Sequence, residues 1–435
     1  MFFGAKSEKR IAARMQDGEP NQSYGALVRR QFRKNRLAVW SLRALYVLLF
    51  IALFADFIAN EKPLYCKIEG KTYFPVFKQY AVDLGWTHWD ARFANADWQT
   101  LKYDAALFTL IPYSATTLDR KNMSYVSPTK KQNIPSNRFR HWLGTDQIGH
   151  DILAGMIAGT RVAMLVGVVS MAIATVIGIF FGAVAGYFGD DHLKVSRIRL
   201  ILTIIALLLG IFYGFIVRTY AFSEGSFGVE LFKSMGILIG ILLVFNLLAS
   251  LLKQIPILGK KIAIPADMLV MRFIEVLNSI PALLLILSVV AVIRQPSILY
   301  VMAIIGLIRW TGIARFIRAE LLKIRHLNYI EAAQAMGFRD WRIILRHALP
   351  NALTSVLIAI AFGVASSILL EAFLSFLGVG VAAEQVTWGT MLNTARRAPS
   401  AWWLAVFPGL AIFFTVTIFN LLGEGLTDAL DPKRK

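Results

Sequence analysis

The segment EAAQAMGFRDWRIILRHALPN occupies residues 331–351 and lies between two long apolar runs. It opens with Glu331 and strong helix formers, and Gly337 can adopt the left-handed conformation that ends a helix. Asp340 is a suitable cap for a second short helix. That helix is expected to place an apolar face to one side, formed by Trp341, Ile344, Leu345 and Ala348. The pattern predicts two short helices joined by a tight turn and exposed to water.

The apolar runs around this segment identify an integral membrane protein. Mean hydropathy is +0.58, and 57% of the residues are apolar. Only 17% are charged, whereas charged residues make up about a quarter of a soluble domain. Crossing a bilayer takes about 20 mostly apolar helical residues, because lipid offers no partners to free backbone groups. Eight runs have this character: 44–58, 162–188, 198–217, 234–252, 268–293, 298–317, 353–377 and 401–422.

Basic residues set the expected topology. Residues 1–43 hold ten Lys and Arg against three acids, which places this N-terminal segment in the cytoplasm. Eight spans return the C-terminal segment, 425–435, to the same side, where basic residues also flank the third and fourth spans. Topology and contact with membrane lipid thus account for the net charge of +19, and we expect no nucleic-acid partner.

The segment between the first two spans is expected to fold outside the membrane. The first transmembrane helix is assigned to 44–59, and residues 60–140 follow it as a periplasmic domain. Their aromatic content indicates a packed unit rather than a loose loop. The single cysteine, Cys66, cannot form an internal disulfide and is expected to be a small apolar filler.

The polar segment at 329–351 has two interpretations: a loop that only connects two spans, or a docking element for a soluble partner. A resemblance favours the second. The segment resembles the EAA loop of permease subunits of ATP-binding-cassette (ABC) importers, which in that family docks in a cleft of the ATPase subunit. The match is carried by Glu331, Ala332, Ala333, Gly337, Leu349 and Pro350. We refer to residues 329–351 as the EAA loop.

Seven further segments resemble, in the same order, the C-type permease of dipeptide and oligopeptide importers. They are HWLGTDQIGHDILAGMIAGTRVAMLVG (141–167), GYFGDD (186–191), MRFIEVLNSIPALLL (271–285), WTGIARFIRAELL (310–322), EAFLSFLGVGV (371–381), TWGTML (387–392) and PGLAIFFTVTIFNLLGEGLTDALDP (408–432). Within this family, residues 57–80 resemble the first external segment of microcin C type oligopeptide uptake permeases. The chain departs from the family at 195–265, where two extra apolar runs form what we call the inserted hairpin.

The resemblance implies an all-α integral membrane protein of about eight transmembrane helices, with an external domain after the first. A six-helix importer permease core, 141–194 and 266–424, would carry the EAA loop, and the inserted hairpin would add two helices. Three glycines of the second span, Gly178, Gly182 and Gly186, lie on one stripe. They indicate close helix packing, with a substrate-lining role as the alternative, whereas the GxxxG spacing at 236–240 also occurs by chance.

The resemblance also implies a division of labour in the inner (cell) membrane. The chain would form half of a heterodimeric pore with a second permease subunit. Two ATP-binding subunits or domains and a periplasmic peptide-binding protein would complete the importer. Oligopeptides, dipeptides or peptide-like antibiotics would then move from the periplasm to the cytoplasm.

The residues agree with a transport subunit that performs no catalysis itself. The sequence contains no phosphate-binding GxxxxGK[ST] loop, so ATP and Mg would be bound by the partner ATPase. It also contains no HExxH motif and no Cys/His set with metal-ligand spacing. We therefore expect no catalytic, cofactor-binding or metal-binding residues in this chain.

Charged residues within predicted spans are informative, because each charge costs about 3 kcal/mol at the bilayer centre. Arg272 and Glu275 lie near the inner end of the fifth span, and Glu371 and Arg309 lie within the seventh and sixth. Glu371 in the seventh span coincides with a glutamate of the family pattern. It either lines the peptide pathway or forms a structural salt bridge or helix–helix hydrogen bond. Arg309 of the sixth span is a candidate partner.

Two other classes of function are compatible with a multi-span chain. A secondary transporter driven by an ion gradient usually has two related halves with interrupted helices at matching positions, and this sequence shows no such symmetry. A membrane-anchored scaffold would bind a partner through its external domain and would need no coupling loop. Co-purification with a nucleotide-binding subunit distinguishes the three classes, because only an importer requires that subunit.

Overall fold

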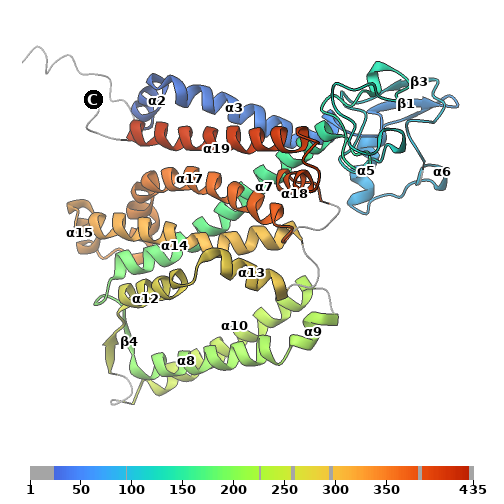
Figure 1. The fold of residues 1–435 in the computed structure, drawn as a ribbon. Helices are drawn as coiled ribbons and strands as arrows, with labels where there is room; N and C mark the ends of the chain where they lie inside the picture. The colour runs from blue at the N-terminus through green and yellow to red at the C-terminus, as the bar shows by residue number, and fades with distance from the viewer. Residues whose placement is uncertain are drawn as a thin grey trace, which may run out of the picture. The chain divides into compact units, whose positions relative to one another are not determined.

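The computed structural model describes residues 24–94, 96–224, 227–255, 260–292, 297–380 and 385–430 (Figure 1). Part of the basic N-terminal segment, 1–23, and the end of the C-terminal segment, 431–435, lie outside the described residues. Within the described part, seven helices are long and apolar enough to cross a membrane, and one bent helix pair could form an eighth span. The protein is mostly helical, as the sequence predicts.

Seven long helices and two compact units organise the chain. The helices are α3 (Arg36–Leu53), α7 (Ile152–Ala183, continued by the π-turn η3, Val184–Phe188), α8 (Arg197–Ile211, continued by the π-turn η4, Phe212–Ile216), α10 (Phe227–Leu252), α14 (Ile298–Ile324), α17 (Leu349–Phe376) and α19 (Trp403–Leu430). The first unit contains Met1–Ile179, Asn278–Ile317 and Leu349–Lys435, and the second contains Phe180–Leu277 and Arg318–Ala348. We describe each unit by itself.

The fifth predicted span, 268–293, is not a single straight helix. The helices α12 (Ala266–Ser279) and α13 (Ala282–Val292) flank a sharp bend at residues 280–281. Pro281 explains the break, since proline has no N–H to donate to the helix and disfavours helical geometry at the preceding residue. Together the two helices are long and apolar enough for one span, so the fifth predicted span corresponds to a bent helix pair.

The seventh span also begins earlier than predicted. The second helix of the EAA loop, α16 (Asp340–Ile343), runs through the π-turn η5 (Ile344–Ala348) directly into α17. Together they form one helix of 37 residues, so the separate second helix expected from the sequence was wrong. The π-turn ends two residues before Pro350, whose missing N–H interrupts the regular ladder of helix hydrogen bonds.

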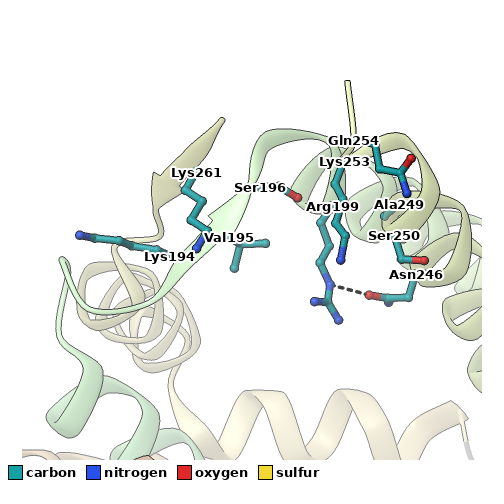
Figure 2. Close-up of a pocket in the computed structure, with 10 residues that line it drawn as sticks. All are labelled: Lys194, Val195, Ser196, Arg199, Asn246, Ala249, Ser250, Lys253, Gln254 and Lys261. Carbon is teal, nitrogen blue, oxygen red and sulfur yellow. Dashed lines mark hydrogen bonds between the residues drawn. The ribbon is translucent and has the colours of Figure 1, made fainter. Parts of the chain in front are cut away.

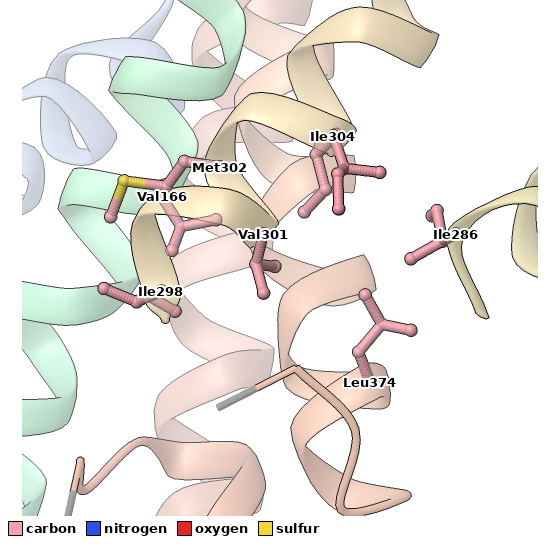
Figure 3. Packing of buried hydrophobic residues seen from close by; sticks show 8 residues of the cluster. Val166, Ile286, Ile298, Val301, Met302, Ile304 and Leu374 are labelled. Atoms are coloured by element: carbon pink, nitrogen blue, oxygen red, sulfur yellow. The ribbon is translucent and has the colours of Figure 1, made fainter. Parts of the chain in front are cut away.

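A buried apolar cluster joins four helices of the first unit (Figure 3). It contains Val166 of α7, Ile286 of α13, Leu374 of α17, and Ile298, Val301, Met302, Ile304 and Ile305 of α14. Beside it, a Cβ added at Gly178 of α7 would come within 2.6 Å of the Ile313 Cβ of α14. The helix-packing interpretation is therefore confirmed for Gly178. Other helices of this unit pack beside the cluster helix α17. Helix α17 contacts α19 and α18 (Trp388–Arg397), and α19 in turn contacts α3 and α2 (Tyr24–Lys34).

Residues 60–140, which the sequence predicts to lie outside the membrane, form a small packed domain, as their aromatic content predicted. Strand β1 (Tyr65–Ile68) lies between β2 (Lys71–Tyr73) and β3 (Ala105–Leu107) in an antiparallel sheet. Short helices complete the domain: α4 (Ala55–Ile58), α5 (Pro75–Asp83), α6 (Ala91–Ala94), and the 3₁₀ turns η1 (Arg120–Asn122) and η2 (Asn137–Phe139). Cys66 is fully buried with Phe93 and Trp98 in the core, and burial raises the pKa of its thiol. This is the filler role expected for it.

His141 attaches the external domain to the start of α7. Its Nδ1 lies 2.8 Å from an Asp151 carboxylate oxygen, and its Nε2 lies 3.1 Å from Asp119. Asp151 in turn accepts a hydrogen bond of 2.7 Å from the Ala154 N–H in the first turn of α7. Burial alone would lower the pKa of His141, but the hydrogen bonds and charges of the two aspartates outweigh burial and raise that pKa.

The inserted hairpin is built from two long helices and a short ribbon in the second unit. A Cβ added at Gly210 or Gly214 of the α8 segment would lie 2.4 Å from the Leu238 side chain or 3.0 Å from the Ser234 carbonyl of α10. At the base, β4 (Lys194–Ser196) pairs with β5 (Lys261–Ala263) in an antiparallel ribbon. A short helix, α9 (Thr219–Glu224), follows the α8 segment along the chain.

The GxxxG glycines of the hairpin do not mediate its packing. A Cβ added at Gly236 or Gly240 would meet no described atom within 4 Å. Gly210 and Gly214, which the sequence analysis did not single out, provide the close approach instead. The chance interpretation of the GxxxG spacing fits this arrangement, since that spacing is common in apolar helices.

Candidate functional site

The first helix of the EAA loop, α15 (Asn328–Ala335), has one buried and one exposed side. Ile330 and Ala333 are buried, with 0% and 3% of their surface exposed. Glu331 and Ala332 are exposed on the other side. The buried side fixes the helix in its unit, so Glu331 is presented to the surroundings in the first turn, where the helix dipole favours a carboxylate.

Gly337 ends this helix in the left-handed conformation that the sequence predicts. Its φ is +76°, and its N–H donates to the Gln334 carbonyl at 2.9 Å. The next residue, Phe338, donates its N–H to the Ala333 carbonyl at 3.2 Å. This pair of bonds is a Schellman motif, which satisfies the last carbonyls of the helix. An added Cβ would meet nothing within 4 Å, so only the backbone conformation restricts this position.

Tyr187 of η3 bridges the two helices of the loop. Its hydroxyl donates to Asp340 Oδ1 at 3.1 Å, and it accepts a hydrogen bond of 3.2 Å from Gln334 Nε2. The neighbouring Phe188 ring contacts Trp341 edge to face, with ring centroids 6.4 Å apart. Sequence reasoning missed this role, although Tyr187 lies in the GYFGDD segment that carried part of the resemblance.

Two expectations for the second helix are corrected. Asp340 was predicted as its cap, but Arg339 takes that position and Asp340 is the first helical residue. Ile344 and Ala348 are buried as expected, whereas Trp341 and Leu345 are 48% and 59% exposed. The apolar face was assigned with regular helical periodicity, and the π-turn at residues 344–348 changes that register.

The loop consequently presents a mixed apolar and charged surface. Met336 is 66% exposed, and it joins Trp341 and Leu345 as an exposed apolar residue of the loop. Charged residues of the same segment are also exposed: Glu331, Arg339, Arg342 and Arg346. Large apolar side chains ringed by charges are typical of a protein–protein docking surface.

Leu349 and Pro350 are the first two residues of α17, so they lie where the loop joins the seventh span. Leu349 is half-buried, and Pro350 is exposed.

Glu371 is buried in α17, but not against Arg309. Only 2% of its surface is exposed, and it accepts a hydrogen bond of 2.6 Å from the Ser375 hydroxyl one turn later. Arg309 instead directs a guanidinium nitrogen to the Ser366 carbonyl at 3.5 Å. Among the ion pairs of the described residues, none joins Glu371 to Arg309, so the structure gives this pairing no support. A role for Glu371 in the peptide pathway stays a prediction.

The architecture defines a class of protein: a multi-span membrane protein that exposes a short polar loop of two helices. Comparison with known proteins narrows the class. Residues 257–435 match the binding-protein-dependent transport system inner membrane component, and residues 23–74 match the N-terminal domain of oligopeptide transport permease C. Most of the inserted hairpin lies outside both matches.

Individual relatives cover most of the chain. The glutathione transport system permease GsiD of Pectobacterium atrosepticum is 30% identical over 83% of this chain and 95% of its own length. The inner membrane ABC transporter permease YejE of Escherichia coli is 29% identical over 93% of this chain and 96% of its own length. The dipeptide transport system permease DppC of Bacillus subtilis is 28% identical over 70% of this chain and 72% of its own length.

The chain belongs to the family of ABC importer permeases that includes these peptide and glutathione transport subunits. It is a multi-pass inner membrane protein and a transport subunit, not an enzyme. Permeases of this family operate with an ATPase and a binding protein.

Proposed function

We propose that this chain forms half of a peptide translocation pore and that its EAA loop couples the pore to ATP hydrolysis by a partner. A second permease subunit would complete the heterodimer. Two ATP-binding subunits or domains would bind ATP and Mg, and a periplasmic binding protein would deliver the peptide. The observation that carries this proposal is the exposed loop, whose two helices are held in a defined geometry by Tyr187 and the Gly337 turn.

The geometry of the loop suits the transmission of force. A docking helix that yielded under load would not move the spans connected to it. Here Ile330 and Ile343 are fully buried, and the Tyr187 hydroxyl bonds to both helices, so the loop is anchored at several points. The exposed Met336, Trp341 and Leu345 side chains supply apolar area for a cleft in the ATPase, and Glu331 supplies a charge for a cation there.

The topology that this function requires follows from the basic residues. The N- and C-termini and the EAA loop would lie in the cytoplasm, and the domain at 60–140 would lie in the periplasm. The basic N-terminal segment and the even number of spans support this orientation, if the bent pair α12–α13 counts as one span. The external domain, anchored on α7 through His141, would then be available to the binding protein.

The transported substrate is proposed to be a peptide or a peptide-like compound. The relatives carry names that specify dipeptides, oligopeptides or glutathione as their cargo. Within this range we propose that the chain belongs to the microcin C type of oligopeptide uptake permease. Residues 57–80 support it, as does a match to YejE over nearly the whole chain.

Co-purification tests the proposal. The tagged full-length chain, expressed with the ATPase subunits of its own importer, should retain them through purification. A variant in which residues 331–337 are replaced by a Gly/Ser linker of equal length should reach the membrane at the same abundance and lose them. Retention of the ATPase by this variant would show that the loop is only a connector.

A further inference from the structure

The base of the inserted hairpin contains a cavity lined by cationic residues (Figure 2). Its volume is about 580 Å³. The lining side chains come from β4, β5 and the facing ends of α8 and α10, and they are Lys194, Val195, Ser196, Arg199, Asn246, Ala249, Ser250, Lys253, Gln254 and Lys261. Four of these ten residues are Lys or Arg, and none is acidic. The cavity is therefore strongly attractive to an anion.

The fold holds these cations together although the sequence separates them. The β4–β5 ribbon pairs Ser196 with Lys261 and so brings the two ends of the hairpin side by side. Arg199 lies in the first turn of α8, and its Nε donates a hydrogen bond of 2.8 Å to Asn246 Oδ1 of α10 (Figure 2). Fixing Nε in this way orients the guanidinium, whose planar edge suits the oxygens of a phosphate.

The position of the cavity indicates that a phosphate bound there would belong to a membrane lipid. It lies at the ends of two helices whose flanks are apolar and exposed. Leu208 of α8 is 63% exposed, and Leu243 and Leu247 of α10 are each 66% exposed. Such flanks belong in the hydrocarbon of the bilayer, so the helix ends lie at the level of the lipid headgroups.

We propose that this cavity binds the phosphate of an anionic phospholipid headgroup in the cytoplasmic leaflet. Arg199, Lys253 and Lys261 neutralise the phosphate, and the Ser196 and Ser250 hydroxyls can hydrogen-bond the polar end of the headgroup. The acyl chains lie along the exposed apolar flanks of α8 and α10. This site lies within the inserted hairpin and does not depend on the coupling role of the EAA loop.

Lipid retention tests the proposal. The full-length chain is reconstituted with equal amounts of phosphatidylglycerol and phosphatidylcholine, re-extracted in mild detergent, and analysed for bound lipid by native mass spectrometry. Phosphatidylcholine also carries a phosphate but no net charge, so retention of phosphatidylglycerol alone is expected. The double variant Arg199→Gln with Lys261→Gln should bind phosphatidylglycerol about 25-fold more weakly, which is about fivefold for each cation removed.

Controls separate this site from general attraction and from a soluble anion. Lys233→Gln removes a cation near the other end of α10 and should leave retention unchanged. Lys253→Gln alone should weaken retention about fivefold, which keeps the test decisive if the double variant does not fold. Unchanged retention in the double variant would overturn the site. Displacement of the lipid by millimolar inorganic phosphate would show that the cavity binds a soluble phosphate and would overturn the proposal of a lipid site.

Discussion

The EAA loop up to Ala348 and the inserted hairpin belong to the same unit, but they are held in different ways. The loop is fixed by its surroundings, through buried residues such as Ile330 and through hydrogen bonds from Tyr187 to both of its helices. The hairpin is fixed mainly by itself, through the contact of α8 with α10 and the pairing of β4 with β5. Only 6% of the most apolar stretch of α10 is buried.

This difference teaches where the protein should tolerate change. A loop whose geometry is set by its neighbours passes a disturbance on to them, as a coupling element must. A hairpin that completes its own contacts can be altered without disturbing the rest of the chain. We therefore expect changes in the loop to reduce transport strongly and changes in the hairpin to reduce it little.

The largest effect is expected from Glu331→Lys. The substitution would replace the proposed charge-assisted hydrogen bond between Glu331 and the ATPase, of about 1.5–3 kcal/mol, by repulsion from the same cation. Peptide uptake by whole cells should fall by a factor on the order of 100 at equal membrane abundance, with weakened retention of the ATPase. Arg339→Ala, a nearby exposed change, is the matched control and should leave uptake close to the wild-type rate.

Gly337→Asp should abolish most uptake for a different reason. A side chain in the left-handed conformation costs about 1–2 kcal/mol, so the turn opens and the second helix changes its direction. Gly337→Asn is the control, since asparagine tolerates this conformation better than most residues. Equal uptake by wild type and the Asp variant would show that the turn has no functional part.

Tyr187→Phe should have an intermediate effect. It removes the two hydrogen bonds that join Gln334 and Asp340, of about 0.5–1.5 kcal/mol each, but retains the ring and its packing. We expect ATP hydrolysis to continue while uptake per ATP falls roughly three- to tenfold, because the loop yields under load. A parallel loss of ATP hydrolysis and uptake would indicate a docking defect rather than a less rigid loop.

Removal of the hairpin should have the smallest effect on transport. Residues 197–260 can be replaced by Asn-Gly, because Ser196 and Lys261 are paired partners in the ribbon and a two-residue turn can connect them. Removing two spans leaves the topology of all later segments unchanged. Uptake should stay within about twofold of the wild-type rate. A complete loss of uptake, with the chain inserted and abundant, would contradict the self-contained view of the hairpin.

The sequence predicts those parts of the structure that depend on local preferences. Eight apolar runs locate the spans, since length and hydropathy are properties of each segment alone. Gly337 was assigned its left-handed turn for a similar reason: few other residues adopt that conformation without strain. The buried filler role of Cys66 was also predicted from the local sequence, because it is a single small residue within an aromatic segment.

Features that depend on distant partners or on exact helix geometry were not predicted. Tyr187 meets Gln334 and Asp340 only because folding brings together residues far apart in the chain. The bend before α13 lies in an apolar stretch, where hydropathy reports the environment but not the path of the backbone. The π-turn at residues 344–348 lies in the EAA loop, where the predicted apolar face assumed regular helix geometry. For Glu371 a local partner was missed. The sequence suggested the distant Arg309 as its partner, whereas its carboxylate accepts a hydrogen bond from Ser375 one turn away.

His141 makes the outer attachment of this membrane protein sensitive to the acidity of its surroundings. Because the aspartates raise the pKa of His141, its proton stabilises the folded attachment at low pH, and this contribution is lost as the pH rises through the raised pKa. The Tyr113 ring is stacked on the imidazole, with ring centroids 4.3 Å apart. If residues 60–140 lie outside the membrane as proposed, a cell in alkaline surroundings would therefore hold this domain less firmly on α7 than a cell in acid.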